Sequence, residues 1–308
     1  MRIVLLTNAA SGKGGSHALA TQAADALGHE GHQVTSVSLA KGWEQRAAGA
    51  ELIVVCGGDG SISAASSHAA ACAVPLYHLP RGTENLFARE FGMRPDVEQL
   101  VASVRAARIE RFDLGVCACE GNPDRTFALM CSVGFDADVL HALAARRKGP
   151  ISHSSYVRPV VACLMKPTIR TLTIEADGRV VVDAAKGNVV VSNCARYALG
   201  IDPSRDASMT DGKLDVFFAP SASSLRTVAW MGMALAGAGR NARSIVRARA
   251  ERVTIRISGP HAEGTSARNG FQLDGEAVSL AESANGPHPS VTLFVRPRAL
   301  PVLLAHQA

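Results

Sequence analysis

A glycine-rich run with one acid and one hydroxyl, Gly57-Gly-Asp59-Gly-Ser61, is the most informative group of residues in the chain. It follows the apolar segment 52–56 and precedes an alanine-rich segment with helical spacing. Glycines let a main chain approach a polyanion closely, and the unpaired amides of a helix N-terminus favour phosphate. An ordinary tight turn is the alternative interpretation. Asp59 favours phosphate binding, because its carboxylate could hold a cation beside the phosphates.

Two further turns carry glycines and polar groups after short apolar segments. The first, Asn8-Ala-Ala-Ser11-Gly12-Lys-Gly-Gly15, lacks both the opening glycine and the final hydroxyl of a Walker A loop, and a helix cap at Ser16 explains it equally well. The second, Pro80-Arg-Gly-Thr83-Glu-Asn85, could also be a helix cap alone. Ligands of parallel sheets bind at the carboxyl ends of the strands, so we expect all three turns to face one crevice.

Alternating strand and helix patterns must position these turns. Before about Arg111, strand patterns occur at 3–6, 33–39, 52–56 and 75–79, and helical patterns at 16–27, 62–72, 84–91 and 97–107. This alternation predicts an α/β domain with a parallel sheet. Later strand patterns follow in series, at 112–119, 126–133, 168–176, 180–183, 188–193, 214–219, 253–257, 272–280 and 290–296, with helical patterns at 136–147, 154–166 and 223–237. That series predicts an antiparallel β-sandwich domain.

Length and composition limit the class of protein. The chain has 308 residues, of which 47% are hydrophobic and 19% charged, which indicates two globular domains or one long one. The apolar segment at the N-terminus is too short for a signal peptide core, and no apolar segment is long enough for a bilayer span, so we expect a cytoplasmic protein without a transmembrane segment. Any contact with the inner face of the membrane would be peripheral. The seven scattered cysteines lack metal-site spacing and indicate reduced core residues.

The net charge of +5 is carried mostly by arginine. Basic residues concentrate at Arg146-Arg147-Lys148 and between Arg240 and Arg252. A solvated face is the simplest interpretation, and attraction to anionic lipid headgroups or to nucleic acid are the alternatives. We expect no nucleic-acid partner, because aromatic residues make up only 5% of the chain and leave few platforms for stacked bases. The sequence leaves a homodimer open.

Six motifs in order resemble the catalytic domain of diacylglycerol kinases, sphingosine kinases and bacterial soluble lipid kinases, a group related to NAD kinases. The motifs are Asn8-x-x-Ser-Gly12, Gly57-Gly-Asp-Gly-Ser61, Pro80-x-Gly-Thr-x-Asn-x-x-Ala-Arg89, Ser132-Val-Gly-Phe-Asp-Ala-Asp138, Asp211-Gly-Lys-Leu-Asp215 and Leu273-Asp-Gly-Glu276. The resemblance implies a nucleotide-binding α/β domain at 1–111, completed by about 297–308. It also implies a β-sandwich domain at 112–296 that supplies the catalytic acid and a lipid-facing surface.

The resemblance implies a phosphotransferase that moves the γ-phosphate of ATP, with Mg²⁺, to the hydroxyl of a diacylglycerol, a sphingoid base or a related lipid alcohol. It assigns the ATP phosphates to Asn8, Ser11, Gly12, Gly57, Gly58, Asp59, Gly60, Ser61 and Thr83. The implied catalytic base is Glu276, and the i, i+2 spacing places Asp274 beside it on one side of a strand, with a hairpin turn as the alternative.

Asp211-Gly-Lys213 resembles the family's structural Mg²⁺ loop. In that loop the Asp211 side chain and the main-chain carbonyls of Ser208 and Lys213 would hold the ion, since Mg²⁺ prefers oxygen ligands. A plain Asp-Gly turn is the alternative.

Two departures from the family pattern surround Asp59. Ala64 and Leu86 stand where many relatives carry a carboxylate, so the expected network of water and Mg²⁺ is incomplete and the acceptor is not fixed. The chain could therefore be a member of the fold that binds nucleotide or lipid without turnover. An NAD kinase-like enzyme is favoured by Gly57–Gly60 and disfavoured by the motif from Pro80 to Arg89. A Rossmann oxidoreductase ranks last, because the first turn lacks Gly-x-Gly-x-x-Gly.

Overall fold

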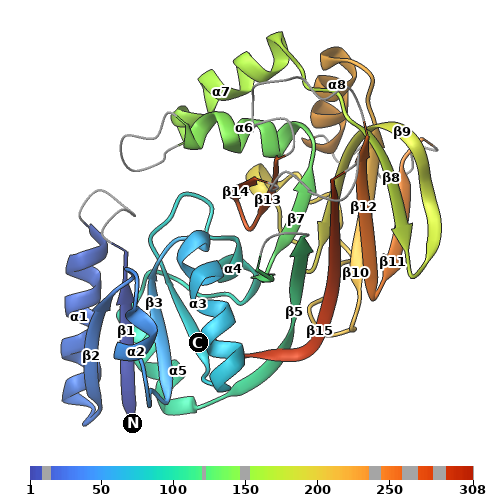
Figure 1. Ribbon diagram of the computed structural model, residues 1–308. Helices are drawn as coiled ribbons and strands as arrows, with labels where there is room; N and C mark the ends of the chain where they lie inside the picture. The colour runs from blue at the N-terminus through green and yellow to red at the C-terminus, as the bar shows by residue number, and fades with distance from the viewer. Residues whose placement is uncertain are drawn as a thin grey trace. The chain divides into compact units, whose positions relative to one another are not determined.

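The computed structural model describes residues 1–8, 15–119, 123–145, 153–235, 244–258, 270–279 and 289–307 (Figure 1). The chain divides into two compact units. The first consists of Met1–Asp113 with Pro297–Ala308, and the second lies within Leu114–Arg296. Two long strands, β5 (Ile109–Cys119) and β15 (Ser290–Leu303), have residues in both units.

The first unit is a parallel sheet with helices between its strands. The strand order is β2-β1-β3-β4 followed by the end of β15, and these pairings are parallel. The strands are β1 (Arg2–Thr7), β2 (Gln33–Ser38), β3 (Leu52–Gly57) and β4 (Leu76–Pro80), and the helices are α1 (Gly15–His29), α2 (Trp43–Arg46), α3 (Asp59–Cys72), α4 (Leu86–Glu90) and α5 (Val97–Ala106). Every residue of β3 and β4 is buried, as expected for parallel strands covered on both faces.

The second unit is a sandwich of two antiparallel sheets. One sheet has the order β14-β13-β7-β9-β10-β11, and the other contains β9, β8, β12 and β15, with β5 and β6 beyond β15. The strands are β6 (Arg125–Phe127), β7 (Met130–Val133), β8 (Thr171–Ala176), β9 (Arg179–Ser192), β10 (Leu214–Pro220), β11 (Val246–Ala250), β12 (Arg252–Ser258), β13 (Gly270–Leu273) and β14 (Glu276–Ser279). Strand β9 joins the two sheets, because its first half pairs with β8 and its second half with β7 and β10.

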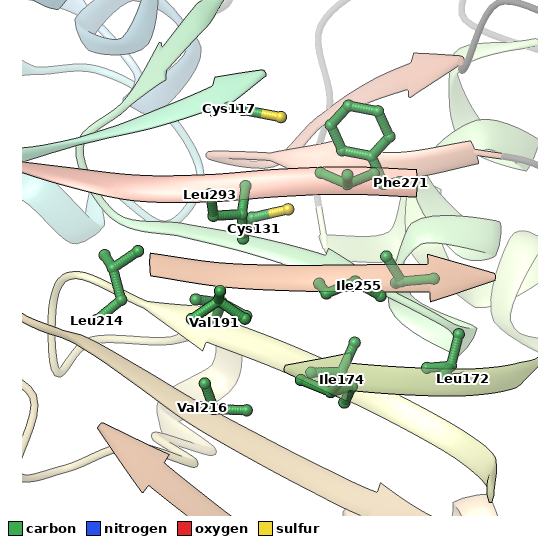
Figure 2. Packing of buried hydrophobic residues seen from close by; sticks show 14 of the residues in the cluster. Cys117, Cys131, Leu172, Ile174, Val191, Leu214, Val216, Ile255, Phe271 and Leu293 are labelled. Atoms are coloured by element: carbon green, nitrogen blue, oxygen red, sulfur yellow. The ribbon is translucent and has the colours of Figure 1, made fainter. Parts of the chain in front are cut away.

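Alternate side chains of these strands form the core of the second unit. Along β8, partly exposed and buried residues alternate strictly, which is the pattern of a strand with one face on the core. Figure 2 shows Ile174, Ile255 and Leu293 from one sheet packed with Val191 and Phe271 from the other. None of these five side chains is more than 1% exposed. The predicted fold class, an α/β domain followed by an antiparallel sandwich, is therefore confirmed.

The described residues of the second unit also form three helices and a short 3₁₀ helix. They are α6 (Phe135–Ala144), α7 (His153–Met165), α8 (Ser224–Leu235) and the 3₁₀ turn Ala198–Gly200. In the part of the chain that the structure describes, no helix is both long enough and apolar enough to cross a bilayer.

Several strands differ from the sequence-based expectation. The single strand expected at 126–133 is divided into β6 and β7 at Ala128 and Leu129, and the one expected at 272–280 is the β13–β14 hairpin. Hydrogen bonds to the distant Asp274 fix the first break, which the local sequence does not reveal, and the second break is the Asp274-Gly275 turn itself. The strands expected at 180–183 and 188–193 are one strand, β9, and β11 was not predicted because its alternate residues are arginine.

We expect Leu293→Ala to lower the free energy of unfolding by about 2 to 5 kcal/mol, because it leaves a cavity in the sandwich core. Val180→Ala, at a side chain that is 54% exposed on β9, should change it by less than about 0.5 kcal/mol. Urea denaturation of both variants measures the difference. Equal stability of the two variants would contradict the assignment of Leu293 to the core.

Candidate functional site

Gly58 and Gly82 bring two turns of the first unit into direct main-chain contact. Gly58 joins β3 to α3, and Gly82 lies in the turn between β4 and α4. A Cβ added to Gly82 would lie 2.6 Å from the Gly58 Cα atom, and a Cβ added to Gly58 would lie 3.1 Å from the Gly82 Cα atom. The close approach excludes a side chain at Gly82 and leaves little room for one at Gly58. Two of the three predicted phosphate turns are therefore adjacent at the carboxyl edge of the parallel sheet.

Asn85 closes the second turn with its side chain. Its Oδ1 atom accepts a 2.7 Å hydrogen bond from the Gly82 amide, and its Nδ2 atom donates to the Gly82 carbonyl at 2.9 Å. Asn85 has φ of 50°, a left-handed conformation that Asn adopts more readily than most residues. No role of its own was predicted for Asn85, although its place three residues after Gly82 is the signal for this closed turn.

Asp59 caps helix α4. Its Oδ2 and Oδ1 atoms accept hydrogen bonds from the Leu86 and Phe87 amides at 2.9 Å and 3.0 Å. A carboxylate at these amides satisfies two unpaired donors of the helix and favours the helix dipole. Asp59 therefore fixes the second turn against the first, which is a role that the sequence did not predict. Each carboxylate oxygen retains a further lone pair for another ligand.

The end of the first strand contributes Asn8 to the same edge. Asn8 Nδ2 donates a 3.3 Å hydrogen bond to the hydroxyl of Ser61, in the first turn of α3. Asn8, the first residue of the first turn, thus contacts the Gly57–Ser61 run as expected. Ser11 and Gly12 lie outside the described residues. Gly60 and Thr83 are partly buried in the two adjacent turns.

His78 contacts the Gly57 turn through its side chain. Its side chain on β4 is fully buried, and its Nε2 atom lies 2.9 Å from the Gly57 carbonyl. Burial lowers the pKa of His78, although the Asp59 charge and the hydrogen bond to Gly57 oppose that effect. A neutral imidazole with its proton on Nε2 fits this contact, since a carbonyl oxygen can only accept.

Asp274 and Gly275 form the turn of the β13–β14 hairpin in the second unit, with φ of 49° and 84°. The expectation that Asp274 and Glu276 lie on one side of a strand is therefore wrong, because β13 ends at Leu273. Glu276 begins β14 and is exposed, whereas Asp274 is only 4% exposed. The hairpin gives the two carboxylates different surroundings.

The buried Asp274 carboxylate holds the segment between β6 and β7. It accepts hydrogen bonds from the amides of Ala128 at 2.7 Å, Leu129 at 2.8 Å and Met130 at 3.0 Å. The Asn193 side chain donates to the Ala128 carbonyl at 2.8 Å from the other side. Three main-chain donors give Asp274 a structural role, and they fix the turn from which Glu276 extends.

Two carboxylates and one arginine lie together at the predicted metal loop. Asp211 Oδ1 accepts a 3.0 Å hydrogen bond from the Lys213 amide, and Arg249 on β11 forms ion pairs with both Asp211 and Asp215. Ser208 Oγ lies 2.9 Å from the Thr210 hydroxyl. Among the described residues, no three His, Cys, Asp or Glu side chains gather as a metal cluster.

The charge of the loop nevertheless fits a divalent cation. Asp215 Oδ2 is buried, and no hydrogen-bond partner within the described residues reaches it. Burial raises the pKa of Asp215, while Arg249 lowers it. Two nearby carboxylates with one unsatisfied oxygen form an oxygen-rich donor set, the kind that Mg²⁺ prefers. The sequence named Asp211, Ser208 and Lys213 for the ion but assigned no role to Asp215 or Arg249.

A second pair of acids lies at the start of α6. Asp136 accepts hydrogen bonds from the Ser132 hydroxyl and, at 2.6 Å, from the Tyr197 hydroxyl. Asp138 forms a bidentate ion pair with Arg170, with N–O distances of 3.0 Å and 2.5 Å. Burial raises the pKa of Asp138, and the arginine lowers it. These contacts connect α6 to the sandwich. They give both acids of the fourth motif a structural role.

The comparison with known families matches both parts of the chain. The profile described as "Diacylglycerol kinase catalytic domain" matches residues 2–117, and the profile described as "YegS C-terminal NAD kinase beta sandwich-like domain" matches residues 130–304. A protein of Mycobacterium tuberculosis named diacylglycerol kinase is 28% identical over 232 residues, which cover 72% of this chain and 74% of that protein.

Solved structures share the fold. The crystal structure of a diacylglycerol kinase from Bacillus anthracis superposes with a TM-score of 0.66 and 16% identity, over 98% of this chain and 96% of that one. Another solved chain from the same organism gives a TM-score of 0.71 and 17% identity, over 98% of this chain and 95% of that one. At these identities the structures establish the fold alone.

Lowering the pH should destabilise the protein partly through His78. Because burial lowers its pKa in the folded state, the unfolded chain binds the proton more readily, and stability is lost as the pH falls below the usual histidine value of about 6.5. We expect His78→Gln to reduce this loss between about pH 7 and pH 5, by up to about 1.4 kcal/mol for each pH unit. His17→Gln, at an exposed position on α1, should not, and unfolding at several pH values measures both. An unchanged pH dependence in His78→Gln would contradict the account.

Asp274→Ala should lower the free energy of unfolding by about 3 kcal/mol or more, because three buried amides lose their acceptor and the alanine must adopt a positive φ. Glu276→Ala, two residues away and exposed, should change it by less than about 0.5 kcal/mol. Chemical denaturation of the two variants compares these costs. A stable Asp274→Ala variant would rule out the anchoring role of Asp274.

Proposed function

We propose that this chain, which belongs to the family with a diacylglycerol kinase catalytic domain and a C-terminal NAD kinase-like β-sandwich domain, is an ATP-dependent lipid kinase. It would transfer the γ-phosphate of ATP to the hydroxyl of a lipid such as a diacylglycerol, a sphingoid base or a related alcohol. In this proposal residues 1–111 with 297–308 bind the nucleotide. Residues 112–296 supply the base and the surface that meets the lipid.

The contact between Gly58 and Gly82 is the observation that carries the proposal. Two turns without side chains meet at the carboxyl edge of a parallel sheet, where such sheets bind their ligands. Main-chain amides in a glycine turn can donate to phosphate oxygens at a distance that a Cβ would prevent. The Asn8 amide and the hydroxyls of Ser61 and Thr83 add side-chain donors to the same edge.

Phosphoryl transfer to an alcohol needs a group that accepts the hydroxyl proton and groups that stabilise the transferred charge. We assign the proton acceptor to Glu276, since its carboxylate is exposed, whereas Asp274 is buried under three amides. Asp274 is then a positioning residue that fixes the hairpin turn.

The proposed Mg²⁺ would be held by Asp211, with the carbonyls of Ser208 and Lys213, and Asp215 adds a carboxylate to that set. When bound, the ion would supply positive charge next to the acidic loop. Arg249 now balances both carboxylates, so binding of the ion would require the arginine to move away from at least one of them.

The surroundings of Asp59 bear on the alternative of a protein that binds without turnover. Both Asp59 oxygens accept one hydrogen bond each from α4 amides, Leu86 carries no charge, and Glu84 pairs with Arg89 at 3.7 Å. The Arg89 guanidinium thus already balances the charge of Glu84. Phosphate transfer, rather than nucleotide binding, is the property that decides between the two functions.

We expect the wild-type chain, with radiolabelled ATP, Mg²⁺ and detergent-dispersed lipid alcohols, to give a labelled phospholipid. Glu276→Gln should reduce the rate by about 100-fold or more, because the amide cannot accept the proton, while nucleotide affinity measured by calorimetry is retained. Glu251→Gln, at another exposed position of the second unit, is the matched control and should keep full activity.

Two results would overturn the proposal. Nucleotide binding without transfer to any lipid would favour the binding protein, and transfer to NAD instead of lipid would favour the NAD kinase-like enzyme. Full activity in Glu276→Gln would leave the kinase but remove Glu276 as its base.

A further inference from the structure

Helix α7 exposes an apolar stripe. Val157, Val161 and Met165 are 61%, 53% and 77% exposed, and they recur every fourth residue, so they lie along one face of the helix. Isolated exposed apolar residues are common on soluble proteins, but an aligned group marks a surface that binds something. The stripe is therefore a candidate binding surface.

Helix α8 extends this stripe into a wider surface. The Ser224 hydroxyl, at the start of α8, donates a 2.6 Å hydrogen bond to the Leu164 carbonyl near the end of α7, and Figure 1 draws the two helices beside each other. Leu225 is 79% exposed and Val228, one turn later, is 45% exposed. Ile169, which follows α7, and Thr227 of α8 line the same pocket. We define the α7–α8 face as Val157, Val161, Met165, Ile169, Leu225 and Val228.

Basic side chains accompany these apolar ones. Arg158, Lys166 and Arg226 are exposed, and each is the direct neighbour of an apolar residue of the α7–α8 face. Neither α7 nor α8 contains an aspartate or glutamate. The apolar surface is thus combined with positive charge and with no acid on its own helices.

The charge distribution along the sequence is strongly uneven around these helices. Residues 139–174 and 216–250 hold 11 of the 32 Lys and Arg residues and none of the 27 Asp and Glu residues. The other 237 residues therefore have 21 basic and 27 acidic side chains, a net charge of −6. Two of the 11, Arg170 and Arg249, pair with carboxylates, whereas Arg158, Lys166 and Arg226 form no ion pair with the acids that the structure describes.

We propose that the α7–α8 face is a membrane-docking surface for bilayers that contain anionic lipids. The apolar side chains would enter the boundary between headgroups and acyl chains, and Arg158, Lys166 and Arg226 would bind the anionic headgroups, which is how peripheral amphipathic surfaces divide these tasks. The inference deepens the proposed function and rests on it for the choice of partner, since a lipid acceptor is dissolved in a bilayer.

Charge complementarity favours a bilayer over a second copy of this chain. Two copies that met through the α7–α8 face would bring basic segments of the same sign together, which opposes association, whereas an anionic surface attracts them. A second copy therefore enters only as an outcome of the test.

Sedimentation with vesicles, measured without nucleotide, tests the proposal. We expect the wild-type chain to bind vesicles with roughly one third phosphatidylglycerol and to bind pure phosphatidylcholine much more weakly, with binding reduced at high salt. Val161→Glu with Leu225→Glu should abolish sedimentation, and Lys166→Ala and Arg226→Ala should each weaken it by about fivefold. Val180→Glu, at a 54% exposed valine of β9 next to the β8–β9 turn, is the matched control and should bind as the wild type does.

Three outcomes would overturn the proposal. They are a wild-type chain that does not sediment with anionic vesicles, a doubly substituted face that still sediments, and a dimer that the same substitutions dissociate while vesicle binding is unchanged. The kinase hypothesis is tested separately, because detergent-dispersed acceptors need no bilayer. A chain that binds vesicles but transfers no phosphate would contradict the proposed function and leave the docking surface in place.

Discussion

The candidate nucleotide site depends on one close approach of main chains, between Gly58 and Gly82. Neighbouring strands of a parallel sheet end about 5 Å apart, so the turns that follow them can touch only where side chains are absent. The hydrogen bonds from Arg81 to Gly57, from Gly82 to Asn85 and from the α4 amides to Asp59 all presuppose this contact. A methyl group at Gly82 would separate the two turns and break that set together.

Buried and partly buried polar side chains fix the turns in both units by binding main-chain groups. In the first unit Asp59 and Asn85 do this, and in the second Asp274 does it for the segment between β6 and β7. A buried amide without a partner is costly, so each of these side chains determines a backbone conformation that the local sequence would not adopt alone. Acids in a family motif can therefore be structural, and their exposure and hydrogen-bond donors distinguish them from acids that react.

The sequence predicted the architecture well, because periodicity is a local property. Buried runs such as Leu52–Gly57 and the strict alternation of Thr171–Ala176 are visible without any partner. The site was predicted by residue type and not by geometry, since Asp59 as a cap and Asp274 as an anchor depend on amides 27 and 146 residues away. A hairpin turn was the alternative interpretation of Asp274-Gly275, and the structure shows that turn between β13 and β14.

The position of Asp274 also changes how a loss of activity at the hairpin should be interpreted. Glu276 extends from a two-residue turn whose first residue is fixed by three hydrogen bonds, so any substitution at Asp274 can move Glu276. An inactive Asp274 variant is thus compatible with a purely structural residue. Substitution of a residue that positions another should lower both the stability of the protein and its reaction rate. Substitution of a base at an exposed strand end should lower the rate and leave the stability unchanged. Measurement of both rate and stability therefore distinguishes the roles of the two carboxylates in this motif. Neither their spacing nor the rate alone does so.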